Sequence, residues 1–170
     1  NTYTGGTTST GGNIYVSSSK GLGTGLVTLD GGILYFNPTT VGGTSTVSSI
    51  RTRSDILLGN NVLLDVTSGN LLMRMTNGFW IKASGTGTVG RLTSSSGTLN
   101  LPSVDGSWVT NTGTLTSADH QIQTPIVDFN GSTPLTVTKS GVNDLLLTVA
   151  NTYTGGTTIN AGRIRVNTTS

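Results

Sequence analysis

The octapeptide NTYTGGTT occurs twice in this chain, at residues 1–8 and again at residues 151–158. An identity of eight residues at that separation does not arise by chance in a chain of 170 residues. Self-similarity at a fixed period is the sequence signature of repeat architectures. We therefore expect residues 1–170 to form a single repetitive segment that belongs to a longer chain of the same kind.

In the residues that follow each octapeptide, some positions are identical in the two copies and others differ. When residues 1–20 are aligned with 151–170, one glycine and two aliphatic positions are kept while the residues between them change. The kept pairs are Gly12 and Gly162, Ile14 and Ile164, and Val16 and Val166. Such alternation is typical of a strand with one buried face. The glycines are predicted to form corners, and the aliphatic residues are predicted to point into a core.

A third copy of this pattern, VTLDGGILYF, lies at residues 27–36. It is offset by 20 residues from the first, so that Gly32, Leu34 and Phe36 correspond to Gly12, Ile14 and Val16. The offset predicts coils of about 20 residues each. It also predicts that Ile14 lies one coil from Leu34 and Val16 one coil from Phe36.

The composition favours an all-β chain. Glu is absent, charged residues make up 9% of the chain, and 25 glycines separate short apolar stretches. Two architectures are built from many short strands: a sandwich or barrel of hairpins, and a β-solenoid of stacked coils. Asn-Gly pairs at 77–78 and 130–131 suit hairpins. Similarity at an offset of one coil favours the solenoid, because stacked coils place equivalent residues above one another.

The C-terminal stretch GVNDLLLTVANTYTGGTTINAGRIRV (141–166) resembles the autotransporter-associated β-strand repeat. The stretch LGTGLVTLDGGILYF (22–36) is similar to the segment that commonly follows it, whereas residues 40–140 lack the signature. The resemblance implies a right-handed parallel β-helix of the kind found in passenger regions of large bacterial surface proteins and adhesins. It also implies export through the outer membrane to the cell surface.

Few residues in the chain suit catalysis or cofactor binding. The chain contains no Cys, which excludes disulfides and thiolate metal sites, and its single His is His120. The glycine-rich GTGTVG at 85–90 is followed by a strand-like sequence, whereas a dinucleotide site needs a helix there. No spacing among the Asp residues pairs two carboxylates as a glycosidase requires. We expect no catalytic residue, no metal site and no cofactor, which makes a polysaccharide-degrading enzyme the least favoured function.

Charge and hydropathy also bear on the partners of the chain. The formal net charge is +2, and the nine Lys and Arg residues are scattered along the sequence. Nucleic-acid binding needs such residues clustered on one face, so it is not expected. No apolar run reaches the ~18 residues of a membrane-spanning helix, so direct membrane insertion is not expected either.

Two tryptophans, Trp80 and Trp108, are the candidate glycan contacts. In the stretch FWIKA, alternation places Trp80 opposite to Phe79 and Ile81, so Trp80 is expected to face outwards. An exposed aromatic ring can serve as a platform for a sugar. A module that binds glycans or a host surface is therefore the alternative to the leading hypothesis, which is a structural stalk or fibre segment without chemistry of its own.

Neither end of the sequence has the polar cap that closes an independent solenoid. Both ends carry the same interior-type motif. Further copies of the repeat are therefore the expected partners, either in the same chain or stacked head to tail in a fibre.

Overall fold

The computed structural model describes residues 3–18, 21–36, 43–52, 55–59, 62–73, 80–83, 90–103, 120–140 and 144–166. Within these ranges the chain forms strands, turns and bends, and no helix suited to crossing a membrane occurs among them.

The strands are three to six residues long and are numbered in chain order. They are β1 Thr7–Ser9, β2 Ile14–Val16, β3 Val27–Leu29, β4 Leu34–Phe36, β5 Thr44–Val47, β6 Ile50–Thr52, β7 Ile56–Leu58, β8 Leu63–Val66, β9 Asn70–Met73, β10 Trp80–Ala83, β11 Arg91–Thr93, β12 Thr98–Ser103, β13 His120–Gln123, β14 Thr136–Lys139, β15 Asp144–Leu147, β16 Thr157–Ile159 and β17 Arg163–Val166.

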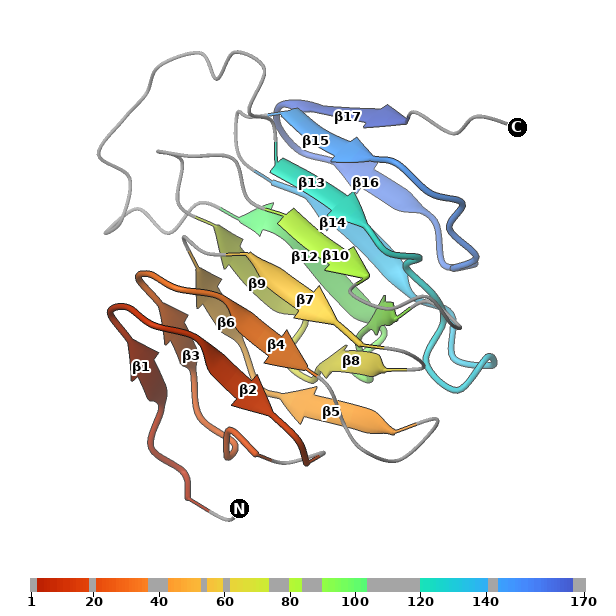
Figure 1. The fold of residues 1–170 in the computed structure, drawn as a ribbon. Helices are drawn as coiled ribbons and strands as arrows, with labels where there is room; N and C mark the ends of the chain where they lie inside the picture. Colours follow the sequence, from red (N-terminus) through yellow and green to blue (C-terminus); the bar gives the residue numbers. More distant parts are fainter. Residues whose placement is uncertain are drawn as a thin grey trace.

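These strands build three parallel sheets that run along one stack of coils (Figure 1). The first sheet has seven strands in the order β1-β3-β6-β9-β12-β14-β16, and the second has seven in the order β2-β4-β7-β10-β13-β15-β17. A third sheet, β5-β8-β11, has three strands. Since all neighbouring strands in these sheets are parallel, the fold is the predicted β-solenoid and not a sandwich of hairpins. Its handedness stays a prediction.

The strand register contains the two residue pairs predicted from the sequence. Ile14 pairs with Leu34, and Val16 pairs with Phe36, on the neighbouring strands β2 and β4. The side chain of Asn13 marks the same period, because its Oδ1 accepts a hydrogen bond from the backbone N–H of Ile33, 20 residues later. Equivalent residues of successive coils are therefore stacked in register.

The 20-residue period does not hold in the middle of the stack. The side chains of Asn70 and Asn100 are hydrogen-bonded across neighbouring strands although they are 30 residues apart. Further along the first sheet, Thr98 pairs with Thr136. The prediction of about 20 residues per coil is thus confirmed at both ends, whereas the middle coils are longer. Two strands can pair in parallel whatever the length of the chain that connects them, so coils of different length still stack in one sheet.

The core is a column of aliphatic side chains enclosed by the sheets. Leu34 is fully buried and Phe36 is 1% exposed, and they belong to one continuous apolar cluster. The predicted corner glycines Gly12, Gly32 and Gly162 have φ values of +74°, +78° and +69°. These values lie in the left-handed region, which a glycine adopts without steric cost.

The C-terminal coil differs from the expected burial. Ile164 contacts the core but is only half-buried, and Val166 is 63% exposed. Both were expected to be core residues, as Val16 is, which is 5% exposed. Both valines lie on an outermost strand with one neighbour, Val16 opposite Phe36 and Val166 opposite Leu147. The difference is that the chain after β2 returns to Val16, where a Cβ on Gly21 would lie 2.9 Å from Cγ1 of the valine. The prediction of a buried Val166 is therefore wrong.

Candidate functional site

The two copies of the octapeptide form the same local structure. The hydroxyl oxygens of Tyr3 and Thr7 lie 2.5 Å apart, and those of Tyr153 and Thr157 lie 2.6 Å apart. Thr7 and Thr157 are the first residues of β1 and β16. In both copies the tyrosine therefore forms a hydrogen bond with the first residue of the strand that follows it. The motif thus fixes the conformation of the chain where it enters the first sheet.

The first of the two adjacent glycines in the motif allows neighbouring coils to approach closely. The N–H of Gly155 donates to the carbonyl oxygen of Leu135 at 3.1 Å, and the hydroxyl of Thr136 donates to the carbonyl oxygen of Gly155 at 3.1 Å. A Cβ atom on Gly155 would lie 2.5 Å from the carbonyl carbon of Leu135. The backbones of the two coils thus occupy the space that a side chain would need.

A carboxylate of the preceding coil binds the second octapeptide. Asp128 Oδ1 accepts hydrogen bonds from the N–H groups of Leu135 and Thr154, both at 2.9 Å, and Oδ2 accepts one from the Thr154 hydroxyl at 2.8 Å. These bonds, first the one from the Thr154 N–H and then the one from Leu135, lower the pKa of Asp128. Asp128 therefore acts as a clamp between two coils in its ionised form.

The lowered pKa predicts how stability depends on pH. Because the folded-state pKa lies below the unfolded value, this carboxylate contributes stability that is fully present above about pH 4 and is lost as the pH falls through the folded-state pKa. Replacing Asp128 with Asn is expected to lower stability at neutral pH and to make the acid-induced loss smaller. Urea midpoints at neutral pH and at about pH 3 measure both effects. Equal midpoint shifts for wild type and variant between these conditions would contradict the prediction.

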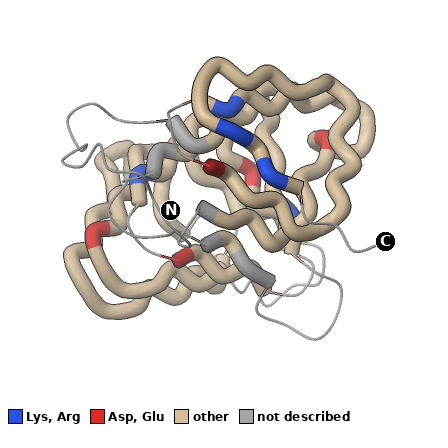
Figure 2. The backbone as a smooth tube through the Cα atoms, turned by 90° about the horizontal axis from the view of Figure 1, so that it is seen from above, with Lys and Arg blue, Asp and Glu red and all other residues tan. Residues whose placement is uncertain are grey.

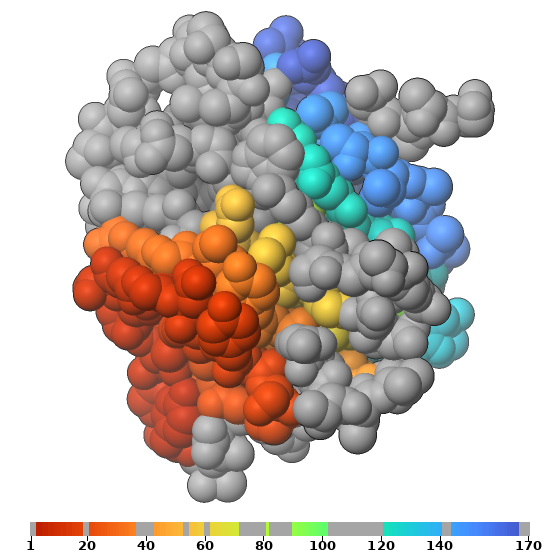
Figure 3. Space-filling model, in the orientation of Figure 1, coloured from red at the N-terminus to blue at the C-terminus, as the bar shows by residue number. Residues whose placement is uncertain are grey.

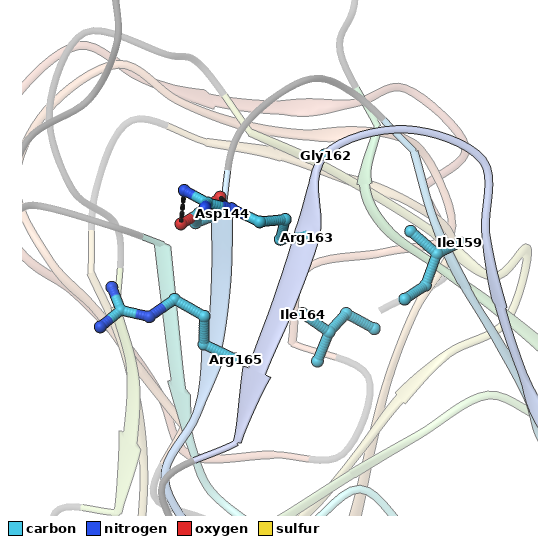
Figure 4. Close-up of a pocket in the computed structure, with 6 residues that line it drawn as sticks. All are labelled: Asp144, Ile159, Gly162, Arg163, Ile164 and Arg165. Atoms are coloured by element: carbon cyan, nitrogen blue, oxygen red, sulfur yellow. Dashed lines mark hydrogen bonds and ion pairs between the residues drawn. The ribbon is translucent and has the colours of Figure 1, made fainter.

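The last coil surrounds a shallow hollow of about 500 Å³ (Figure 4). Its lining consists of Asp144, Ile159, Gly162, Arg163, Ile164 and Arg165. The guanidinium of Arg163 binds the Asp144 carboxylate through two parallel hydrogen bonds of 2.9 and 2.8 Å. These bonds are the largest cause of a lowered pKa at Asp144. The arginine side chain is 76% exposed, so the pair is a surface contact between β15 and β17 and contributes little stability.

A lysine lies inside the solenoid next to this coil. Lys139 is fully buried at the end of β14, and its Nζ donates to the carbonyl oxygens of Ala161 at 3.1 Å and Ser140 at 3.3 Å. Burial lowers the pKa of Lys139, and the charge of Asp144 opposes this shift. The bond to Ala161 holds the corner between β16 and β17, so this ammonium group fastens the last coil to the one before it.

Residues 137–166, which run from β14 to the end of β17, match the family model of the passenger-associated-transport-repeat. This segment fits the autotransporter-associated β-strand repeat. Comparisons with curated proteins and with solved structures found no match. The passenger repeat thus contains the second octapeptide, the buried Lys139 and the Asp144–Arg163 pair. Asp128, which clamps it, belongs to the coil before the match.

The passenger repeat and the first coil lie at opposite ends of the stack (Figure 3). These two coils also carry the large apolar side chains that stay exposed in the described part of the chain. They are Tyr3 and Tyr15 on the first coil, and Ile159 and Val166 on the passenger repeat. All four side chains thus belong to the first and last coils of the described part of the chain.

The candidate glycan contacts are only partly located. Trp80 begins β10, and its backbone pairs with Gln121 of β13 in the second sheet. The side chain of Trp80 and the whole of Trp108 lie outside the described residues. On the same sheet Tyr15 and Tyr35 stack face to face, with ring centroids 4.6 Å apart and an angle of 6° between the rings. Sequence reasoning did not single out these tyrosines, although their equivalence at an offset of 20 residues was visible.

Three carboxylates of the described residues form hydrogen bonds that hold the fold together. Asp65 is 3% exposed and accepts a hydrogen bond from the N–H of Ser95 at 2.7 Å, while Asp128 and Asp144 form the contacts described above. His120 starts β13, but its side chain lies outside the described residues, as do Asp105, Asp119 and residues 85–89 of GTGTVG. In the described ranges no three potential metal ligands come together. Charged residues lie scattered over the coils (Figure 2).

Proposed function

We propose that the chain is a structural segment of an extracellular stalk or fibre on a bacterial surface, in the manner of an autotransporter passenger. One observation carries the proposal: a passenger repeat stacks in register on a solenoid whose two long sheets are parallel throughout. Seven strands at a spacing of ~4.8 Å extend over roughly 30 Å, and each further unit of seven coils would lengthen a rod by about 34 Å. A rod of this kind holds an adhesive tip away from the cell or forms the body of a surface filament.

The polar groups of the described coils support this structural function. Asp128, Asn13 and Lys139 all bond backbone groups of a neighbouring coil. The Ser49 and Ser68 hydroxyls bond one another across coils at 2.7 Å. These polar side chains stabilise the stack of coils. A rod that holds another domain away from the cell needs stable stacking more than it needs a reactive site.

A display experiment tests the proposal. The chain is placed between a secretion signal and an outer-membrane translocator in a Gram-negative host, once alone and once with a binding domain of known ligand at its outer end. We expect protease added to intact cells to cleave both fusions, and only the fusion with the binding domain to attach cells to a ligand-coated surface. Attachment by the chain alone, or protection from protease, would contradict a stalk function.

The alternative is a module that binds glycans through the outer face of the second sheet. It is favoured by the stacked Tyr15 and Tyr35, because Tyr15 is 68% exposed and an aromatic ring is a suitable platform for a sugar. Trp80 lies on the same sheet. A glycan array probed with the purified chain and with the variants Tyr15→Ala and Trp80→Ala tests this alternative. Binding that both variants lose would favour it over the stalk.

A further inference from the structure

We propose that a hollow on the side of the solenoid binds a sugar that carries a carboxylate group, and that Arg91 holds the carboxylate. The hollow has a volume of about 520 Å³, which is within the range of ligand pockets. It continues the third sheet and thus lies on a different face from the stacked tyrosines of the second sheet. The proposal does not depend on the stalk function above, because a rod can carry a binding site on its side.

Three successive coils form the hollow. Arg91 begins β11, and its neighbour Leu92 pairs in parallel with Ile126 of the following coil. The N–H of Leu92 donates to the carbonyl oxygen of Pro125 at 2.9 Å. The N–H of Thr152 in turn donates to the carbonyl oxygen of Ile126 at 3.0 Å. These bonds extend the third sheet beyond β11 over two more coils, and residues of all three coils line the hollow.

The lining residues face outwards from these coils. Leu92 is fully buried, so Arg91 beside it points away from the core. Ile126 is fully buried in the same way, which turns Val127 outwards. Thr152 of the third coil is exposed. A wall of outward-facing side chains belongs to the side of the stack, so the hollow stays open however many coils the solenoid contains.

The guanidinium of Arg91 has no partner among the described residues. Its Nε is buried without an acceptor, and no hydrogen bond or ion pair joins the side chain to another described residue. By contrast, Lys139 and Arg163 are held by acceptors of a neighbouring coil. Buried donors without an acceptor are rare in proteins, so an unused guanidinium that lines a hollow indicates an acceptor from outside the chain. A carboxylate suits it, because two oxygens match the planar fork of the guanidinium.

Asp128 lines the same hollow and limits the charge of the ligand. The hydrogen bonds from Thr154 and Leu135 hold the pKa of Asp128 below its usual value, so this carboxylate is ionised at neutral pH. A ligand with two negative charges would be repelled by it, whereas a ligand with one carboxylate places that group at Arg91. Asp128 Oδ2 accepts one hydrogen bond, from the Thr154 hydroxyl. A carboxylate oxygen can accept more than one, so Oδ2 is available to a hydroxyl group of the ligand.

The remaining lining suits the ring of a sugar. The hydroxyl of Thr152 has no partner among the described residues, so it can bond a sugar hydroxyl. Pro125 and Val127 are half-buried and offer an apolar surface to the C–H groups of the ring. Pockets of this kind combine an apolar lining with a few polar groups that fix orientation. A carboxylate for Arg91, hydroxyls for Asp128 and Thr152 and an apolar ring face are together the groups of a hexuronate.

Titration of the isotope-labelled whole chain, followed by nuclear magnetic resonance, tests the proposal, because amide signals report both affinity and position. The probes are glucuronate, a linked trimer of the same uronate, glucose and inorganic phosphate. We expect glucuronate to shift the signals of Val127 and Thr152 with a Kd on the order of 1 mM, and glucose and phosphate to bind far more weakly. Tighter binding of the trimer would identify a polysaccharide as the source of the uronate, and equal binding a single sugar.

Two matched arginine variants locate the site. Arg91→Gln removes the guanidinium from the hollow, so we expect it to bind glucuronate roughly 10- to 150-fold more weakly than wild type. Arg165→Gln removes the same charge from β17 in the second sheet and is expected to bind like wild type. Thr152→Val removes one hydroxyl at nearly constant shape and is expected to weaken binding roughly 2- to 10-fold. The dispersion of the amide signals shows whether each variant is folded.

Three results would overturn the proposal. They are the absence of shifts at glucuronate concentrations far above the expected Kd, equal binding by Arg91→Gln and Arg165→Gln, and phosphate binding as tight as that of glucuronate. The last result would show an anion site without preference for a sugar. None of them would affect the display experiment, so failure of this binding site and failure of the stalk function remain distinguishable.

Discussion

Replacing Phe36 with Ala is expected to lower the free energy of unfolding by about 3–5 kcal/mol. Phe36 is 1% exposed and heads the group of largest fully buried side chains. Its strand lies between β2 and β7, where it pairs with Val16 on one side and Leu58 on the other. Truncation removes contacts to both neighbouring coils and leaves a cavity that a stack of rigid sheets cannot close. Urea denaturation followed by circular dichroism measures the loss.

The adjacent residue supplies the control for this variant. Tyr35 lies on the same strand but faces outwards, where it is partly exposed and stacks on Tyr15. Tyr35→Ala removes a ring of similar size and one aromatic contact, so we expect a loss of only about 0.5–1.5 kcal/mol. Equal losses for the two variants would mean that the burial assigned to the two faces of β4 is wrong.

The second large effect is expected at a glycine of the octapeptide. Gly155→Ala should destabilise the chain by about 1–3 kcal/mol, because its Cβ would overlap the backbone of Leu135, which cannot move without separating two hydrogen-bonded coils. The free energy of unfolding from urea titration is again the measurement. Amide hydrogen exchange would locate the loosened contact, with faster exchange expected at Gly155 and along β16.

Gly5 is the matched control, because it occupies the same place in the same octapeptide. No atom lies within 4 Å of the position of its Cβ, so Gly5→Ala should leave the stability of the monomer close to that of wild type. A control this close in sequence isolates the neighbouring coil as the cause of the difference. If both substitutions cost the same, the glycines are required by the local conformation of the motif and not by stacking.

Much of the solenoid could be predicted because its order is nearly one-dimensional. Each coil contacts mainly the coils before and after it, so an equivalent position carries equivalent chemistry at a short, constant offset. The alternation of Ile14 and Val16, repeated by Leu34 and Phe36, was sufficient to predict the register of β2 and β4. Gly12 and Gly32 were sufficient to predict the corner before those strands, since few residues other than glycine adopt a positive φ there.

The contacts that hold the passenger repeat in place could not be predicted in the same way. Asp128 and Thr154 are 26 residues apart, and Lys139 and Ala161 are 22 apart, so neither pair follows the spacing of a single coil. Both pairs join a corner or turn to the next coil, where connections vary in length. No local pattern marked Asp128 as a clamp or Lys139 as a buried residue, because each looks like an ordinary polar residue of a turn or strand.

The sequence by itself therefore determined the strand faces, the glycine corners and the family of the C-terminal coil, since these follow from residue type and repeat spacing. Only the tertiary structure decided how the longer middle coils continue the sheets, which polar groups join one coil to the next, and which core residues are covered. Burial depends on whether a neighbour lies above a residue, and a residue does not carry that information. Val16 and Val166 follow the same motif and are the same residue type, yet Val16 is covered by Gly21 of the turn after its strand and is 5% exposed, whereas Val166 is 63% exposed.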